Sequence, residues 1–528
     1  MSYTSYSYLL IFLGTVFISY TAAPKKFKWA VLLTASYVFY ALNSGKLTVF
    51  LLLSTAAVYF AGILLDCIAD TSALAKKGLE REEKKKLKTL INYQKKAVVV
   101  LTLGFIFGIL LTIKYSGFFA GIFNRAAEFV RLDFALPEFK FLMPLGISYY
   151  TLQAAGYVID VYRGKYRASR NFGKVALFLS FFPQITEGPI GRFDELADPL
   201  YEGHGFSYDN LTKGLQLMAW GLFKKMVIAD RVNIFVSEVF GNYGGCSGSI
   251  LLAAGALYTL QIYAEFSGCM DIVTGSAQLF GVPLAKNFER PFFSKSVSEF
   301  WRRWHITLGA WLRDYVFYPV SLSSPCMRMG KFARARLGEH FGSFLPTAFA
   351  LLITWIGIGF WHGAGVKYLI YGLYYYALMM LGMLLEPLIA RGFSALSLKR
   401  ESKPLNALRI LRTSALVIGG MMLFRADSVS AWLAMLKRVF VSFDAGGFAG
   451  TVLKCGMDRQ DFFIVLLGAA AMLIVSLLQE KGIKIRESVA KQGLAVRWAA
   501  YAGLVMAIVI FGAYGTGYDA VDFIYGQF

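Results

Sequence analysis

The sequence predicts an all-α protein that crosses a membrane many times, and three observations predict this fold class. The 528 residues are 57% hydrophobic and only 16% charged, whereas soluble domains average about 45–50% apolar and about 25% charged residues. A bilayer-crossing helix takes about 20 apolar residues, and such runs recur along almost the whole chain. Basic residues cluster between alternate runs. These features favour a single integral-membrane domain over residues 1–528 rather than several soluble domains.

Apolar runs divide the chain into about 11–12 expected membrane spans. The runs cover residues 6–22, 29–42, 47–65, 97–113, 141–159, 211–240, 249–266, 344–361, 366–387, 408–424, 461–478 and 497–513. The first run is preceded by an uncharged segment and followed by lysines, which is the reverse of a secretory signal peptide. We therefore expect it to be the first span.

The basic residues predict the orientation of these spans. Cytoplasmic loops of membrane proteins carry an excess of Lys and Arg next to anionic lipid, so the formal charge of +21 indicates a membrane partner and not a nucleic acid. The densest clusters fall in the predicted cytoplasmic segments, which are residues 23–28, 66–96, 160–174, 282–340, 388–407 and 479–496.

This alternation predicts a multi-pass protein of the cell membrane with both termini outside the cytoplasm. The extracytoplasmic segments include the C-terminal tail, residues 514–528. Residues 425–460 depart from the pattern, because they should lie outside yet carry five basic residues. Their amphipathic spacing predicts a segment that lies along the outer surface.

Residues 173–193 are apolar but interrupted by proline and glycine, and they carry Gln184 and Glu187. Non-helical backbone at membrane depth is tolerated only where protein or a water-filled cavity covers it. We therefore expect a re-entrant segment whose polar side chains line a cavity.

Residues 260–281 place polar side chains in an otherwise apolar run, including Gln261, Glu265 and Asp271. Two interpretations remain open. The side chains could hydrogen-bond between closely packed helices, or the two carboxylates could form the polar wall of a substrate cavity.

Residues 296–319 have the spacing of a two-faced helix, with Trp304 on an aromatic face and Arg302 and Arg303 on a charged one. Such a helix is expected to lie in the membrane interface instead of crossing it. His305 falls at the edge of the aromatic face, from which it could point into the protein.

His362 lies in the sequence IGIGFWHGAG, directly after Trp361 and at the junction of two predicted spans. An imidazole, whose ordinary pKa is about 6.5, can exchange a proton at neutral pH. A hydrogen bond between helices is the alternative, but an ionisable side chain within a membrane favours a functional role. The five cysteines are far apart, and the four histidines form no HExxH motif, so we expect no metal site.

Four motifs together resemble those of the membrane-bound O-acyltransferases. They are SEFWRRWHITLGAWLRDY, GFWHGAG, FFPQITEGPIGRF and QIYAEFSGCMDIVTGSAQLFG. The resemblance extends along the whole chain and is strongest over residues 141–377, the predicted catalytic core. It is closest to the branch that O-acetylates alginate, peptidoglycan and other polysaccharides.

The resemblance implies a ring of tilted helices around a central tunnel, with re-entrant and interfacial helices in its walls. It implies that His362 and His305 are catalytic. It also implies that the donor is a cytoplasmic acyl thioester, either acetyl-CoA or an acyl carrier protein, with no tightly bound cofactor. The basic cytoplasmic segments suit such an acidic donor.

The C-terminus resembles a terminal motif of the same branch, in which Tyr525 matches a tyrosine proposed to carry the acyl group. A phenol with a pKa of about 10 needs a base to become nucleophilic at pH 7, and a histidine in the tunnel could supply it. The resemblance implies an extracytoplasmic SGNH-type acetyltransferase as partner, which would pass the group to a cell-surface polysaccharide. An interfacial aromatic anchor is the alternative role for Tyr525.

Two classes of function compete. The first is an enzyme that moves an acyl group, expected to be acetyl, across the membrane. The second is a transporter or flippase for lipid-linked saccharides, which would also have broken helices and intramembrane carboxylates. The transporter predicts inverted repeats, and residues 1–250 show no self-similarity with residues 251–528 in hydropathy or motif. The sequence therefore favours the enzyme.

Overall fold

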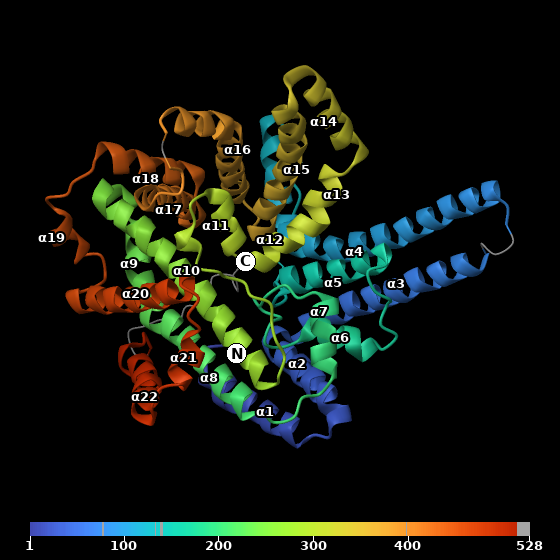
Figure 1. Ribbon diagram of the computed structural model, residues 1–528, viewed down its shortest axis with the longest axis horizontal. Helices are drawn as coiled ribbons and strands as arrows, with labels where there is room; N and C mark the ends of the chain where they lie inside the picture. Colours follow the sequence, from blue (N-terminus) through green and yellow to red (C-terminus); the bar gives the residue numbers. More distant parts are fainter. Residues whose placement is uncertain (76–78, 133, 138–140, 398, 515–528) are drawn as a thin grey trace. The chain divides into compact units, whose positions relative to one another are not determined.

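The computed structural model describes residues 1–75, 79–132, 134–137, 141–397 and 399–514, and every regular element within these ranges is a helix (Figure 1). This confirms the predicted all-α class. The described chain forms two units. The N-terminal unit comprises Met1–Leu215 and Val273–Ala285, and the C-terminal unit comprises Gln216–Ile272 and the chain from Lys286 onward.

The N-terminal unit is built on long apolar helices. Its elements are η1 (Ser7–Phe12), α1 (Leu13–Ala22), η2 (Lys25–Phe27), α2 (Lys28–Ser44), η3 (Gly45–Leu47), α3 (Thr48–Ala75), α4 (Arg81–Phe129), α5 (Ile147–Arg163), α6 (Phe172–Ser180) and α7 (Phe193–Tyr201). Helix α3 packs against α4 and α5, and α2 packs against α6. Two further helices, α8 (Tyr208–Leu222) and α10 (Gly248–Leu279), each contribute residues to both units.

The C-terminal unit contains the remaining elements. They are η4 (Phe223–Ala229), α9 (Asp230–Gly241), η5 (Tyr243–Gly245), η6 (Pro291–Phe293), α11 (Val297–Arg303), α12 (Ile306–Leu312), η7 (Arg313–Phe317), α13 (Tyr318–Ser321), α14 (Ser324–Leu337), α15 (Glu339–His362), α16 (Val366–Ala395), α17 (Lys403–Arg425), α18 (Val429–Val441), α19 (Phe448–Val452), α20 (Arg459–Glu480), α21 (Ile485–Ala490) and α22 (Leu494–Phe511). Helix α15 packs against both α14 and α16, and α11 packs against α16 and α17.

Eight helical stretches among the described residues are long and apolar enough to cross a membrane, which confirms a polytopic fold. They are Lys25–Ala75, Arg81–Phe129, Gly248–Leu279, Glu339–His362, Val366–Ala395, Lys403–Arg425, Arg459–Glu480 and Leu494–Phe511. The first of these contains two of the twelve predicted spans.

Three other predicted spans differ from these eight stretches. Residues 6–22 form the shorter helical run Ser7–Ala22, and residues 141–159 contribute to α5, which has 17 residues. Residues 211–240 fall in α8, η4 and α9, where four charged residues stand between positions 224 and 231.

The single two-faced helix predicted over residues 296–319 is wrong. The chain forms α11, breaks at Trp304 and His305, and continues as α12, η7 and α13. The cause is local, because His305 has φ of 46° and ψ of 52°, a left-handed conformation that ends a right-handed helix. The side chains of residues 296–303 and of residues 306–319 therefore do not share the faces of one helical wheel.

Two other predicted segments have mixed outcomes. The segment at residues 425–460 contains an amphipathic helix, α18, which buries Ala431, Trp432 and Met435. Its position along an outer surface stays a prediction. Residues 173–193 contain α6 followed by buried turns, so the expected non-helical backbone is present directly after Ser180.

Candidate functional site

His362 is the last residue of α15, and glycines allow α16 to approach it closely. A Cβ atom on Gly359 would lie 2.6 Å from the carbonyl oxygen of Tyr368, and one on Gly363 would lie 2.3 Å from the ring of the same tyrosine. His362 is 4% exposed. Its ring centroid lies 5.7 Å from that of Tyr371 and 5.3 Å from that of Phe424, so aromatic contacts restrict its position.

His305 occupies the break between α11 and α12 and is 3% exposed. Its ring meets the ring of Phe266 edge-on, at 4.9 Å between centroids. Trp361 contacts both histidines, with its ring centroid 5.6 Å from that of His305 and 5.1 Å from that of His362. This tryptophan therefore links the two predicted catalytic side chains.

A cavity of about 420 Å³ brings His305 and His362 together. Its walls come from α11, α12, η7, α15 and α16, and Trp301, Trp304 and Trp355 contribute large aromatic surfaces. The volume falls within the range of about 300–1,000 Å³ that is typical of small-molecule sites. The cavity therefore has a mainly apolar lining that includes two imidazoles. This arrangement is suited to proton transfer away from bulk water.

Burial determines the charge state of His305. Removal of the ring from water lowers the pKa of His305 to about 3, because a buried imidazolium loses its hydration. The ring is therefore neutral at pH 7. A neutral imidazole has one nitrogen that donates a hydrogen bond and one that accepts.

Asn287 contacts His305, and sequence reasoning missed it. Its Oδ1 lies 3.2 Å from Nδ1 of His305 and also accepts hydrogen bonds from Thr307. No sequence pattern marked this residue, because Asn287 and His305 are 18 positions apart and η6 and α11 lie between them.

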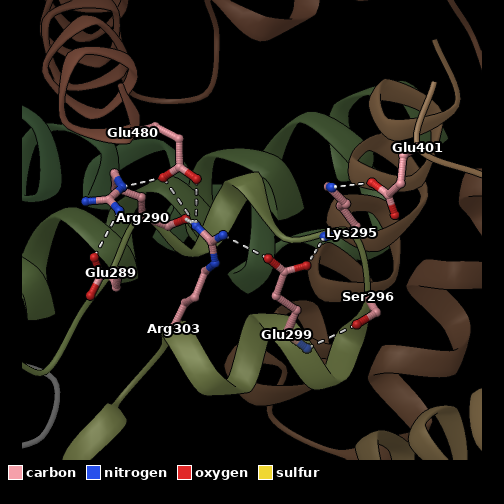
Figure 2. Close-up of polar contacts among 8 residues, drawn as sticks. All are labelled: Glu289, Arg290, Lys295, Ser296, Glu299, Arg303, Glu401 and Glu480. Atoms are coloured by element: carbon pink, nitrogen blue, oxygen red, sulfur yellow. Dashed lines mark hydrogen bonds and ion pairs between the residues drawn. The ribbon is translucent and has the colours of Figure 1, made fainter. Parts of the chain in front are cut away.

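The two adjacent arginines predicted to line the site have different surroundings. Arg302 is exposed and lines the cavity. Arg303 instead joins an ion-pair network (Figure 2), in which its guanidinium lies 2.8 Å from a carboxylate oxygen of Glu299 and 3.3 Å from one of Glu480. Glu480 also pairs with Arg290. The network connects α11 to the end of α20 and leaves Arg302 as the arginine of this pair that lines the cavity.

The polar side chains of α10 are paired with groups on η4 and α9. Glu265 lies 3.2 Å from Nζ of Lys225, and Asp271 lies 2.7 Å from Nζ of Lys224. Gln261 donates to Asn233. None of these three side chains is among the residues that line the cavity of the two histidines. Of the two interpretations left open by the sequence, pairing between helices is the one that these contacts fit.

Of the three remaining predicted site residues, the two that the structure describes are not among those that line the cavity of the two histidines. Gln184 and Glu187 belong to the N-terminal unit, where both are about 1% exposed in the turns after α6. Tyr525 lies outside the described residues. No three His, Cys, Asp or Glu side chains in the part of the chain that the structure describes are grouped so that they could hold a metal ion.

Comparisons with known proteins agree with the motifs. The sequence model of the membrane-bound O-acyltransferase family matches residues 167–413, which include both cavity histidines. The probable alginate O-acetylase of Pseudomonas aeruginosa is 30% identical over 83% of this chain and 75% of its own length. The corresponding protein of Pseudomonas syringae pv. tomato is 31% identical over 82% of this chain and 73% of its own length.

A second group of relatives acts on other polymers, to judge by their names. The peptidoglycan O-acetyltransferase of Helicobacter pylori is 31% identical over 49% of this chain and 50% of its own length. The shared feature of all these relatives is acyl transfer, which favours the enzyme over the transporter. The chain therefore belongs to the membrane-bound O-acyltransferase family and is a multi-pass membrane acyltransferase.

Proposed function

We propose that this protein transfers an acetyl group from a cytoplasmic thioester to a hydroxyl group, as the first step in O-acetylation of a cell-surface or secreted polysaccharide. One observation carries the proposal. His305 and His362, which are 57 positions apart, line the same cavity of about 420 Å³. The names of the most similar relatives, which acetylate alginate or peptidoglycan, support acetyl as the acyl group.

The proposed chemistry assigns His362 as the general base. Its imidazole accepts the proton of the attacking hydroxyl as the oxygen forms a bond with the thioester carbonyl carbon. The carbon–sulfur bond then breaks, and the imidazolium returns the proton to the leaving thiolate. His305, which is neutral, assists by hydrogen bonding within the same cavity. The overall exchange of a thioester for an ester consumes and releases no net proton.

The donor is proposed to be acetyl-CoA or an acetylated carrier protein. Both carry phosphate groups, and Arg302 and Arg313 provide positive charge at the cavity. Arginine is suited to phosphate because its planar guanidinium can donate two parallel hydrogen bonds. The donor is a substrate that leaves after each turnover, so the proposal needs no tightly bound cofactor.

The acceptor side of the proposal involves Tyr525, whose hydroxyl would carry the acetyl group as a tyrosyl ester. An extracytoplasmic acetyltransferase of the SGNH type would then move the group to the polysaccharide. This part rests on the resemblance of the C-terminal sequence to the branch motif and on the charge alternation, which predicts an extracytoplasmic C-terminus.

The first test is His362→Ala, with polysaccharide acetylation measured in cells and thioester consumption measured on purified protein. General acid–base catalysis contributes roughly 10²–10⁴-fold, so we expect both activities to fall by at least 10²-fold while the protein remains inserted. His340→Ala is a matched control, because His340 lies on the same helix near its other end and does not line the cavity. Full acetylation in His362→Ala would refute the assignment.

The second test concerns the shuttle. Removal of residues 523–528 should abolish both the acetylated form of the protein and transfer to the polysaccharide, because the acceptor hydroxyl is lost, while the protein remains folded and inserted in the membrane. Tyr525→Phe should have the same effect, because it removes only the hydroxyl. Recovery of the acyl group on a residue other than Tyr525, by mass spectrometry of the trapped intermediate, would contradict this role.

A further inference from the structure

The side chain of Asn287 is buried between His305 and the first turn of α12. It is 3% exposed. Its Oδ1 lies 3.2 Å from Nδ1 of His305, 3.1 Å from the backbone nitrogen of Thr307 and 2.9 Å from Oγ1 of Thr307. Asn287 thus supplies the acceptor at the start of α12, where the side chain of the N-cap residue His305 makes no capping bond.

These contacts fix the orientation of the Asn287 amide. The backbone N–H of Thr307 can only donate a hydrogen bond, so the atom that faces it must be the carbonyl oxygen of the amide. The amide nitrogen on the other side lies 3.2 Å from Sδ of Met270, a weak acceptor that suits an N–H donor. The reverse orientation would place a donor against a donor and is excluded.

The backbone holds Asn287 in this position. The N–H of Ile306 donates to the carbonyl oxygen of Asn287 at 2.9 Å, and the N–H of Glu289 donates to that of Arg303 at 2.9 Å. The segment that carries Asn287 is therefore attached to the chain on both sides of His305. Rotation of the amide away from the imidazole would require the loss of its bonds to Thr307.

The orientation of the amide determines which nitrogen of His305 carries the proton. Because Oδ1 is an acceptor, the nitrogen that faces it must donate, which places the proton on Nδ1. We propose that Asn287 is a positioning residue that holds His305 in the Nδ1–H tautomer, so that Nε2 presents its lone pair as a hydrogen-bond acceptor for the hydroxyl substrate. The role in acyl transfer rests on the proposed function, whereas the tautomer follows from the hydrogen bonds alone.

The tautomer matters because the ring is neutral at pH 7. A neutral ring in the Nδ1–H form accepts a hydrogen bond at Nε2 and can orient the substrate O–H, whereas the Nε2–H form can only donate there. His305 lines the cavity and Asn287 does not. Asn287 therefore acts through His305 and does not contact the substrate itself.

The test is ¹⁵N NMR of the full-length protein in detergent micelles, with ¹⁵N-labelled histidine. The chain contains four histidines, and the signals of His305 are identified by their loss in His305→Gln. We expect a protonated Nδ1 and an unprotonated Nε2 in the wild type. In Asn287→Leu we expect the Nε2–H form to increase and acyl transfer to fall roughly 10²-fold, as for loss of a group that positions the reacting hydroxyl during general acid–base catalysis.

Two further variants separate positioning from folding. Asn287→Asp keeps an acceptor at the same place, so the Nδ1 proton should remain, and the added negative charge should raise the pKa of His305 and shift the pH profile of activity. Met270→Leu removes only the contact to the amide nitrogen and nearly conserves volume. It should keep the tautomer and change activity by less than about threefold.

An Nε2–H signal for His305 in the wild type would overturn the proposal, as would an unchanged tautomer in Asn287→Leu. If Asn287→Leu does not fold, the wild-type spectrum and Asn287→Asp still decide the question. Retained acyl transfer in His362→Ala together with the expected tautomer would instead reject the proposed function and leave the assignment at Asn287 intact.

Discussion

The left-handed backbone of His305 is unusual for a residue with a side chain, because such a conformation costs about 1–3 kcal/mol. Surrounding contacts maintain it, since the residues on either side are bonded to the segment that contains Asn287. The break allows side chains from two short helices to face one cavity, as Arg302 of α11 and Leu308 of α12 do. The strained residue, His305, thus lies at the point where α11 and α12 meet at the cavity.

Burial of His305 predicts a specific dependence of stability on pH. The pKa of His305 is lowered from 6.5 to about 3 in the folded protein, so below pH 6.5 the unfolded chain binds a proton that the folded protein does not. The stability from the neutral ring is present above pH 6.5 and is lost as the pH falls towards 3. At pH 5 the loss should be about 2 kcal/mol.

Thermal unfolding of the purified protein between pH 4 and pH 8 measures this effect. His305→Gln carries no titrating ring, so the wild type should lose about 2 kcal/mol more than this variant between pH 8 and pH 5. If the stability of the two proteins changed equally with pH over this range, His305 would have an ordinary pKa and this prediction would be wrong.

Sequence motifs identified both histidines that line the cavity, because their glycine and tryptophan neighbours are distinctive. The different surroundings of Arg302 and Arg303 were not predictable. The difference depends on Glu480, which is 177 positions from Arg303 and reaches it only through the packing of α20. Asn287 was not predicted for the same reason, because its hydrogen bonds join it to residues that are 18 and 20 positions away in the sequence.

At the scale of elements, the α15–α16 pair places His362. The two helices approach so closely that a Cβ atom on Gly372 would lie 2.3 Å from the carbonyl oxygen of Trp355. That oxygen is part of the backbone and cannot rotate away. The close approach fixes the end of α15, and with it the position of His362 relative to the cavity wall.

Gly372→Ala should therefore destabilise the protein by about 1–3 kcal/mol and reduce acyl transfer, because it separates the two helices. Gly357→Ala is the matched control. This residue is also within a helix of the pair, but a Cβ atom there meets no atom within 4 Å. The control should be neutral or slightly stabilising, as expected for Gly to Ala in a helix. Equal unfolding temperatures for the two variants would contradict the close packing.

Hydropathy predicted the helices of this pair well, since the runs at 344–361 and 366–387 lie within α15 and α16. It failed at the break near His305. A helical wheel assumes that one helix continues through the segment. Trp304 and His305 are not residue types that predict the left-handed conformation that His305 adopts. Tertiary hydrogen bonds decide this feature, so local pattern reasoning could not find it.

At the scale of the whole molecule, the charge pattern predicts which side of the membrane each segment occupies. Cys67 is a natural probe of this prediction, because it is exposed and begins the basic segment 66–96, whereas the other four cysteines are buried. Lys46 is exposed in a segment predicted to lie outside.

A membrane-impermeant maleimide should therefore label Cys67 only after the cells are permeabilised. In a Cys67→Ser background, Lys46→Cys should be labelled in intact cells. The Cys67→Ser protein without the second substitution reports the background from the buried thiols. Labelling of Cys67 in intact cells would reverse the predicted orientation and would place the proposed thioester site on the opposite side.

The ion pairs between η4 and α10 also have a consequence for biosynthesis. Lys224 precedes its partner Asp271 by 47 residues, and Lys225 precedes its partner Glu265 by 40 residues. Charged side chains at the centre of a membrane helix cost about 2.5–3.5 kcal/mol each on insertion scales. Residues 211–240, which carry both lysines, are not among the eight described stretches that are long and apolar enough to cross a membrane. We therefore expect the charges on α10 to offset this cost, so that the two segments insert more stably together than the earlier segment does alone.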